Sequence, residues 1–473
     1  MIAIFDLGRT NKKFILFDRD YHIIEETATA IPDIKDEDGD DCEDLSAIFS
    51  WMKQQLQIAL EDEKYNIKAV NFSAHGASFV HLDKSGMPAT PLYDYMKPLE
   101  QEFLDEFYDL FGGKENFPLA TGSPALDMLN SGIQLYWLKK CRPDYFNKIE
   151  TSLHLPQYAN YFFSHKVHAD YSSIGCHTGL WDFKRRDYHS WLETEKLRRL
   201  LPKPEVSEAY DVVNFKNKKI PVGVGLHDSS AALLPFVKTS ASPFLLLSTG
   251  TWNITLNPYF EGSLSKEELK KDCLFFLLDK GQKVAASRLF LGKEYDFQVR
   301  RLEVFFDKKR GYAQNVSLDK RKIQWLADNQ AEDNTFYPEK MQGTGPFPCL
   351  KGKQPNLFQF DSFEEAYLKL MLDLTFLQTK SIKMVCGDIK RLYISGGFIK
   401  NKVFMEILQA FLPDWQIFIA ENKRATALGA ALSMHEVVYD TPPPKSVTSV
   451  VPFEKKLSLQ LDKYEMPHLE IEI

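Results

Sequence analysis

The sequence has few cysteines, and none of them stand close together. Six cysteines are spread along 473 residues without any CxxC pair: Cys42, Cys141, Cys176, Cys273, Cys349 and Cys386. This spacing disfavours a disulfide framework or a zinc site, and it favours free thiols in a reducing compartment. We therefore expect a cytoplasmic protein.

Long apolar segments and an excess of positive charge are also missing. No apolar run approaches the roughly 18 residues that a membrane helix needs, so we expect no membrane segment. Met1 leads directly into a predicted strand, and we expect no signal peptide. The chain has 58 Lys and Arg against 65 Asp and Glu, a formal net charge of −7, which argues against nucleic acid or an anionic membrane as a partner. The one marked run of like charge, residues 36–44, is acidic, and we interpret it as a solvated loop.

What the sequence does contain is a pair of similar hairpin-like segments. The first, AIFDLGRTNKKFILFD at residues 3–18, predicts apolar strands over Ile2–Phe5 and Phe14–Phe17. The turn between them gathers a glycine, a hydroxyl, an amide and three cations: Gly8, Arg9, Thr10, Asn11, Lys12 and Lys13. These residues suit a plain turn. They equally suit a phosphate cradle, with Asp6 at the end of the strand holding Mg²⁺.

The second segment, PFLLLSTGTWNITLNP at residues 243–258, repeats this pattern. Gly250 falls where Gly8 does, and Thr251 supplies a hydroxyl beside it. Two such hairpins, each at the start of one half, indicate a duplicated domain, and strands mixed with helices predict an α/β fold. We expect an N-terminal domain over residues 1–238, a C-terminal domain over 239–437, and a tail over 438–473 that forms an appended strand or arm.

A glycine-containing motif lies near the end of the second half. LYISGGFIKNKVFMEIL at residues 392–408 predicts a strand, a turn at Gly396 and Gly397, and a helix that opens near Asn401. A helix N-terminus of this kind can admit a nucleotide. A plain strand-to-helix turn has the same pattern.

Two motifs of the first half carry ionisable side chains. GLHDSSAAL at residues 225–233 places Asp228 before a predicted helix, where it is either a general base or the helix N-cap. FSAHGASF at residues 72–79 places His75 and Gly76 after a buried strand. His75 either donates a hydrogen bond to a sugar hydroxyl or is satisfied by its neighbours. The strand that follows is expected to pair with the segment beyond a turn at Asp83–Gly86.

Together, and in this order, the motifs resemble those of the FGGY carbohydrate kinases over residues 1 to about 437. The resemblance implies two ribonuclease-H-like domains of the actin-like ATPase type around a central cleft, and it implies ATP and Mg²⁺ as cofactors. The His-Asp pair at residues 227–228 and the Gly-Thr-Trp segment at residues 250–252 are most similar to those of the rhamnulose- and fuculose-type kinases. The sequence departs from the family at Gln134, where a lysine is usual, and at Tyr95 and Lys97, where an acid and an arginine are frequent. These departures weaken the substrate assignment but not phosphoryl transfer.

The resemblance also implies a role for each motif. It makes Asp228 the catalytic base and Asp6 the metal-associated carboxylate. It places a sugar at His75, Gly76 and Asp228. It places the nucleotide and its phosphates at Gly8, Thr10, Asn11, Lys13, Gly250, Thr251, Gly396, Gly397 and Asn401.

We therefore expect an ATP-dependent kinase of a small ketose such as rhamnulose, fuculose or xylulose, with sugar and ATP as its partners. The sequence leaves open whether the chain forms a homodimer. One alternative is an actin-like ATPase without a small acceptor, but the sequence lacks a peptide-binding β-domain after the two halves. The other is a catalytically degenerate sugar-binding regulator, which the phosphate loops and Asp228 argue against. Fold analogy alone says little about the substrate.

Overall fold

The computed structural model describes residues 1–473 except 216–217, 342–343, 346–352, 422–423, 456–457 and 468–473. Cys349 lies outside the described residues, and none of the other five cysteines forms a disulfide. The chain forms two compact units. Unit 1 contains Met1–Ser240, Phe275–Val284 and Lys423–Thr448, and unit 2 contains Ala241–Leu274, Ala285–Asn422 and Ser449–Ile473.

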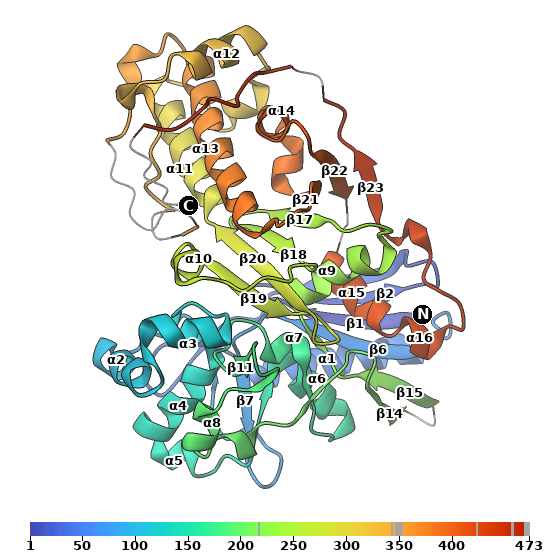
Figure 1. The fold of residues 1–473 in the computed structure, drawn as a ribbon. Helices are drawn as coiled ribbons and strands as arrows, with labels where there is room; N and C mark the ends of the chain where they lie inside the picture. Colours follow the sequence, from blue (N-terminus) through green and yellow to red (C-terminus); the bar gives the residue numbers. More distant parts are fainter. Residues whose placement is uncertain (216–217, 342–343, 346–352, 422–423, 456–457, 468–473) are drawn as a thin grey trace. The chain divides into compact units, whose positions relative to one another are not determined.

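A seven-stranded sheet forms the centre of unit 1 (Figure 1). Its order is β14, β15, β6, β1, β2 and β3, and β16 also pairs with β6. The bounds are β1 (Ile2–Leu7), β2 (Lys12–Phe17), β3 (Ile23–Thr29), β6 (Ala69–Ala74), β14 (Tyr210–Phe215), β15 (Lys218–Gly223) and β16 (Leu226–His227). Strands β1 to β3 form an antiparallel meander, and β6 lies parallel to β1. The hairpin expected over the first turn is confirmed, and its register sets Asp6 opposite Lys13.

Helices cover both faces of this sheet. Ala3, Phe5 and Leu7 are buried with the apolar residues of α1 (Leu45–Glu61) and α6 (Leu155–Ser164). Helices α9 (Asp228–Thr239) and α15 (Ala425–Ser433) pack on each other, and α15 packs on β1 and β6. Because side chains of a strand point alternately to its two faces, Asp6 emerges on the side of α15.

The rest of unit 1 has its own hydrophobic cluster, built mainly from helices and aromatic side chains. Its elements include α2 (Gln101–Leu110), α3 (Gly113–Thr121), α4 (Ser131–Cys141), α7 (Tyr171–Ile174), α8 (Trp191–Thr194), β7 (Phe79–Leu82) and β9 (Thr151–His154). Strand β7 pairs along its whole length with β9, a partner that was not predicted, and the expected pairing with the segment beyond the turn is present only in part. The segment beyond the Asp83–Gly86 turn contributes one isolated bridge, between Leu82 and Pro88. Pro88 and Pro91 lack the backbone N–H that a ladder needs there.

The acidic run of residues 36–44 is also not simply a solvated loop. Asp36 and Glu43 are buried, at 8% and 5% exposure. The Lys97 ammonium lies 2.6 Å from Asp36 Oδ2, 3.0 Å from Asp38 Oδ2 and 2.6 Å from Asp40 Oδ2. A buried cation needs compensating charge, and the run supplies it.

Unit 2 repeats the plan of the first sheet. Its strands include β17 (Leu245–Thr249), β18 (Asn253–Asn257), β20 (Lys283–Leu289), β21 (Arg391–Gly396) and β22 (Gln416–Glu421). Strands β17, β18 and β20 form an antiparallel meander, and β21 lies parallel to β17 just as β6 lies parallel to β1. The expected duplication is therefore visible within the two sheets.

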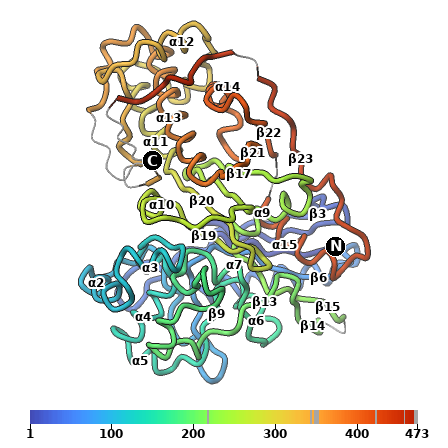
Figure 2. The backbone as a smooth tube through the Cα atoms, in the orientation of Figure 1, coloured from blue at the N-terminus to red at the C-terminus, as the bar shows by residue number. Residues whose placement is uncertain are grey.

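The helices of unit 2 include α10 (Lys266–Lys270), α11 (Leu291–Phe305), α12 (Lys320–Asp328), α13 (Phe363–Val385) and α14 (Lys402–Phe411). The chain ends on this unit, where β23 (Ser449–Pro452) pairs antiparallel with β22. Leu459, Leu461, Tyr464 and Met466 are then buried in its main hydrophobic cluster. Figure 2 shows this segment running from β23 toward α12, where Gln460 N–H donates to Gln324 Oε1 at 2.9 Å.

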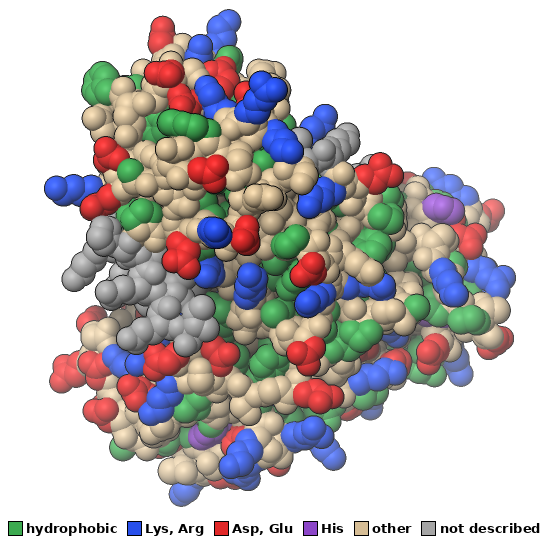
Figure 3. Space-filling model, turned by 45° about the horizontal axis from the view of Figure 1, so that its top comes forward, with side chains coloured by type: hydrophobic (Ala, Val, Ile, Leu, Met, Phe, Trp, Pro, Cys, Tyr) green, Lys and Arg blue, Asp and Glu red, His purple; other side chains and the backbone are tan. Residues whose placement is uncertain are grey.

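The surface carries charge of both signs. On the face drawn in Figure 3, Lys and Arg side chains are interspersed with Asp and Glu. Among the helices that the structure describes, none has the length and apolar character to cross a membrane.

Candidate active site

The carboxyl end of β1 presents Asp6, which is 6% exposed. Its Oδ1 accepts a hydrogen bond from Ser73 Oγ at 2.9 Å, and its Oδ2 accepts one from Thr426 Oγ1 at 3.3 Å. Lys13 Nζ lies 3.6 Å from Oδ2. Burial raises the pKa of Asp6; the charge of Asp228 adds to the rise, whereas Ser73 and Lys13 oppose it. Thr426 was not predicted, because it follows Asp6 by 420 residues and belongs to no motif that points to it.

Some of the other residues of the first turn are exposed, and others hold the turn in place through contacts with neighbouring side chains. Thr10 and Asn11 are exposed, and Gly8 and Lys13 are half-buried. Arg9 instead braces the turn, because its guanidinium contacts Asp33 Oδ1 and Asp94 Oδ2, each at 2.8 Å. The cations of the turn thus serve different purposes.

Lys12 belongs to a buried charged chain that also contains Glu43 and His75. The Lys12 ammonium pairs with Glu43 Oε1 and donates to the carbonyl oxygens of Gly8 and Arg9, both at 3.0 Å. Glu43 Oε2 lies 2.7 Å from His75 Nε2. Burial acts to raise the pKa of Glu43, but His75 and Lys12 outweigh it and lower the pKa to about 2.

Both ring nitrogens of His75 have protein partners. Besides the Nε2 contact with Glu43, His75 Nδ1 lies 3.2 Å from the Gly76 carbonyl oxygen and 3.4 Å from Ser78 Oγ. Glu43 was not predicted as a partner of His75, because it lies in the acidic run that we interpreted as a solvated loop.

Asp228 is the first residue of α9, and His227 is the N-cap. The N-cap interpretation of Asp228 is therefore wrong. Its Oδ1 accepts hydrogen bonds from the N–H and hydroxyl of the adjacent Ser229, at 2.5 and 3.2 Å, and lies 3.2 Å from His227 Nε2. The side chain keeps 31% exposure. Burial raises the pKa of Asp228, and the charge of His75 opposes the shift.

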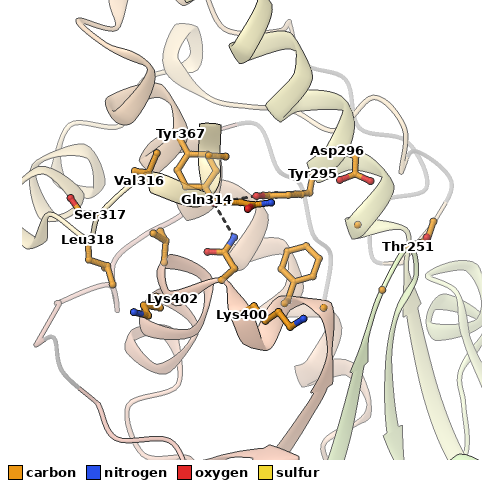
Figure 4. Close-up of a pocket in the computed structure, with 17 residues that line it drawn as sticks. Thr251, Tyr295, Asp296, Gln314, Val316, Ser317, Leu318, Tyr367, Lys400 and Lys402 are labelled. Carbon is orange, nitrogen blue, oxygen red and sulfur yellow. Dashed lines mark hydrogen bonds between the residues drawn. The ribbon is translucent and has the colours of Figure 1, made fainter. Parts of the chain in front are cut away.

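Unit 2 contains a cavity of about 870 Å³. Four of the predicted nucleotide-binding residues line it: Gly250, Thr251, Gly397 and Asn401. Figure 4 shows the rings of Tyr295 and Tyr367 on one side, with Lys400 and Lys402 below them. The cavity therefore combines aromatic surface, cations and two glycine turns.

Strand pairing brings the two glycine motifs together. Strands β17 and β21 are parallel, and their register sets Thr249 opposite Gly396. Thr249 Oγ1 donates to the Ser395 carbonyl oxygen at 2.5 Å and accepts from the Phe398 N–H at 3.1 Å. Gly396 has φ +94°, and a Cβ there would lie 1.9 Å from the Thr249 carbonyl oxygen. Ligands of α/β sheets bind beyond such carboxyl ends of parallel strands.

Asn401 caps α14, as the expected helix opening requires. Its Oδ1 accepts from the Phe404 N–H at 3.1 Å, and its Nδ2 donates to Tyr367 Oη at 2.9 Å. Tyr367 Oη lies 3.3 Å from Tyr295 Oη. Neither tyrosine was predicted, because each lies inside a helix without a local motif.

Comparison with known proteins decides the family. The N-terminal domain of the FGGY family of carbohydrate kinases matches residues 1–235, and the FGGY carbohydrate kinase C-terminal domain matches residues 241–442. The chain belongs to the FGGY family of carbohydrate kinases. This FGGY kinase is 24% identical over 410 residues to a rhamnulokinase from Halalkalibacterium halodurans, a match that covers 79% of the chain and 80% of that protein.

Solved structures show the same fold. A carbohydrate kinase from Novosphingobium aromaticivorans matches with a TM-score of 0.81 at 23% identity, over 98% of this FGGY kinase and 96% of that chain. Plasmodium falciparum glycerol kinase with ADP matches with a TM-score of 0.76 at 15% identity, over 96% and 95%. The mixed α/β architecture in two units is thus that of FGGY kinases.

Proposed function

We propose that this FGGY kinase transfers the γ-phosphate of ATP to a hydroxyl of a small ketose, such as rhamnulose, fuculose or xylulose, with Asp228 as general base. The observation that carries the proposal is the Asp228 carboxylate. It lies among buried groups yet keeps 31% exposure, and its hydrogen-bond donors are those of the adjacent Ser229. A carboxylate with a raised pKa can take the hydroxyl proton as the bond to phosphorus forms.

The cavity of unit 2 supports a nucleotide site. Tyr295 and Tyr367 offer aromatic surface to a base, and the turns at Gly250 and Gly397 let phosphates approach the backbone. Asn401 holds the opening of α14 beside them. The first turn, with Gly8, Thr10, Asn11 and Lys13, is proposed to contact the transferred phosphate.

The residues around Asp6 fit Mg²⁺. This ion prefers oxygen ligands and usually keeps several waters, and Asp6 offers a carboxylate flanked by the hydroxyls of Ser73 and Thr426. Asp6 would hold the ion, and the positive charge of the ion would shield the phosphate oxygens. A cation there would also offset the repulsion between Asp6 and Asp228.

On the sugar side we propose His75 and Gly76 together with Asp228. The Glu43 contact fixes the His75 ring, and the Tyr95 ring lies 5.9 Å from it. The name of the Halalkalibacterium relative favours rhamnulose within this class. Because the two proteins are only 24% identical, the other ketoses are tested as well.

A screen of sugar-dependent ADP release tests the proposal. We expect release with one of rhamnulose, fuculose, xylulose and ribulose, and not with glycerol or gluconate. ADP release that is independent of any acceptor would indicate an actin-like ATPase. Sugar binding without ADP release would indicate a regulator.

Asp228→Asn then tests the base. This variant keeps the shape but cannot take the proton, so turnover should fall by about 10²–10⁴ while sugar and ATP affinities change little. The matched control is Asp187→Asn, which alters an exposed aspartate of the same unit and should keep wild-type turnover. A variant that folds, binds and retains more than about a tenth of wild-type turnover would refute the assignment.

A further inference from the structure

A cluster of metal-ligating side chains lies directly beside Asp228 in unit 1. Cys176, His177 and His227 each offer one ligand atom, and these atoms lie within 4.8 Å of one another. Cys176 Sγ is 3.0 Å from His227 Nε2, and Asp228 Oδ1 is 3.2 Å from the same nitrogen. We propose that Cys176, His177 and His227 bind a thiophilic divalent cation of the zinc class, and that the bound cation inhibits the kinase.

The surrounding contacts orient the ligands as in a built site. His227 Nδ1 lies 3.5 Å from Ser230 Oγ, and that hydroxyl donates to the Leu277 carbonyl oxygen at 3.0 Å. The Nε2 atom therefore faces Cys176. His177 Nδ1 lies 3.2 Å from the Leu129 carbonyl oxygen. Imidazoles that bind metals are usually fixed by such contacts of the other ring nitrogen.

Gly76 makes room for the cluster. A Cβ at this position would lie 2.9 Å from Cys176 Sγ and 3.0 Å from His227 Nε2. The glycine thus permits a thiol and an imidazole to converge at the end of β6. Cys176 and His227 are buried, whereas His177 and Asp228 are partly exposed, so the cluster lies close to the surface of unit 1.

The donor set selects the class of cation. A thiolate and two neutral imidazoles suit Zn²⁺ in tetrahedral coordination. Mg²⁺ prefers oxygen, so the Mg²⁺ that a kinase needs would compete poorly. On binding, the Cys176 thiol releases its proton to solvent, and the fourth position is open to water or to Asp228.

Inhibition follows from the position of the site and rests on the proposed role of Asp228. Asp228 Oδ1 lies 3.2 Å from His227 Nε2, so a cation bound to this nitrogen can take Oδ1 as its fourth ligand. The carboxylate is then held by the cation and is not presented to the sugar hydroxyl.

Binding is measured without turnover, by titrating the reduced, metal-free protein with Co²⁺ in excess Mg²⁺. We expect one Co²⁺ per chain and a thiolate-to-cobalt charge-transfer absorption that Zn²⁺ abolishes. Cys176→Ser removes a direct ligand, so it should lose the absorption and weaken binding by more than the roughly 10–100-fold that loss of an outer-shell contact costs. The control Cys141→Ser, at an exposed cysteine of the same unit, should keep both. His177→Gln provides a second test if Cys176→Ser unfolds. Co²⁺ binding without the thiolate absorption would overturn the site.

Inhibition is measured on the same preparations. Zn²⁺ should suppress ADP release by wild type and Cys141→Ser, whereas Cys176→Ser should keep its basal turnover and resist Zn²⁺. Equal Zn²⁺ sensitivity in Cys176→Ser, or a cobalt site without Zn²⁺ inhibition, would overturn the inhibitory role. Because the cobalt titration needs no substrate, failure of the proposed kinase reaction is distinguishable from failure of this site.

Discussion

Glu43 shows how one carboxylate can hold a functional turn in place. It is 5% exposed and bridges the ammonium of Lys12 and the ring of His75. Lys12 in turn braces the carbonyl groups of Gly8 and Arg9. Through this chain, the shape of the proposed phosphate-binding turn depends on a residue that contacts no substrate in our proposal.

We expect Glu43→Gln to lower the free energy of unfolding of unit 1 by about 3–5 kcal/mol at pH 7, because it leaves a buried cation without its counter-charge. The pKa of Glu43 is lowered from 4.5 to about 2 in the folded protein. Its stabilisation is therefore fully present above pH 4.5 and is lost as the pH falls toward 2. Urea unfolding of wild type and variant at several pH values should show the difference shrinking in this window.

The control for this variant is Asp105→Asn. Asp105 pairs with Lys114 at 2.5 Å, but both side chains are about half exposed, at 50% and 51%. Exposed pairs contribute little to stability because solvent screens them, so this change should be nearly neutral. A Glu43→Gln effect no larger than that of Asp105→Asn would show that the buried chain does not stabilise the turn.

At the scale of elements, the turn from β21 into η6 (Gly397–Lys400) contains two adjacent glycines with different roles. Gly396 has a left-handed φ and no room for a Cβ, because the Thr249 carbonyl oxygen is 1.9 Å away. Gly397 has no such contact within 4 Å and lines the cavity. One glycine thus serves the backbone, and the other leaves space for a ligand.

These roles predict opposite phenotypes. Gly396→Ala should destabilise unit 2, by about 1–3 kcal/mol for the strained positive-φ backbone alone and more for the clash, and the loss should be seen as a lower melting temperature. Gly397→Leu should keep the wild-type melting temperature. It should raise the KM for ATP at least tenfold, about 1.4 kcal/mol, with little change in the KM for sugar. Equal increases in both KM values for Gly397→Leu would place the nucleotide elsewhere.

Local signals explain which elements could be predicted. The strand–turn–strand segments around Gly8 and Gly250 and the opening of α14 depend on glycine, hydroxyl and capping residues within a few positions. The pairing of β7 was missed because its partner, β9, begins 69 residues later at Thr151, and no local pattern reports such pairing.

At the scale of the whole molecule, the order of motifs was enough to predict the family and the duplicated α/β plan. It could not supply the contacts that complete the site. Cys176 meets His227 across 51 positions, and Tyr367 meets Asn401 across 34. Such contacts depend on packing between elements, so the cluster behind Asp228 and the aromatic side of the cavity became visible only in the structure.

The tail shows the same dependence on packing, because its role lies in what it covers. Lys369 and Asp373 of α13 form a fully buried pair, with the ammonium 2.7 Å from Asp373 Oδ1, and the Tyr464 hydroxyl donates to the same carboxylate. Burial raises the pKa of Asp373 and lowers that of Lys369. The tail therefore helps to satisfy a charge that the core of unit 2 would otherwise bury at a cost.

Deleting residues 454–473 should consequently destabilise unit 2 rather than remove a dispensable arm. The deletion removes four buried apolar side chains, each worth about 1.5–3 kcal/mol, and it exposes the Lys369–Asp373 pair.

Tyr464→Phe tests the tyrosine hydroxyl alone and should cost about 1–3 kcal/mol, because the carboxylate loses a buried donor. Lys463→Ala, at an exposed neighbour, is the matched control and should be neutral. Thermal unfolding with and without ATP reports these losses, since a nucleotide that binds the native cavity of unit 2 restores part of the stability. A truncated protein that melts at the wild-type temperature would show that the tail contributes nothing to the core of unit 2.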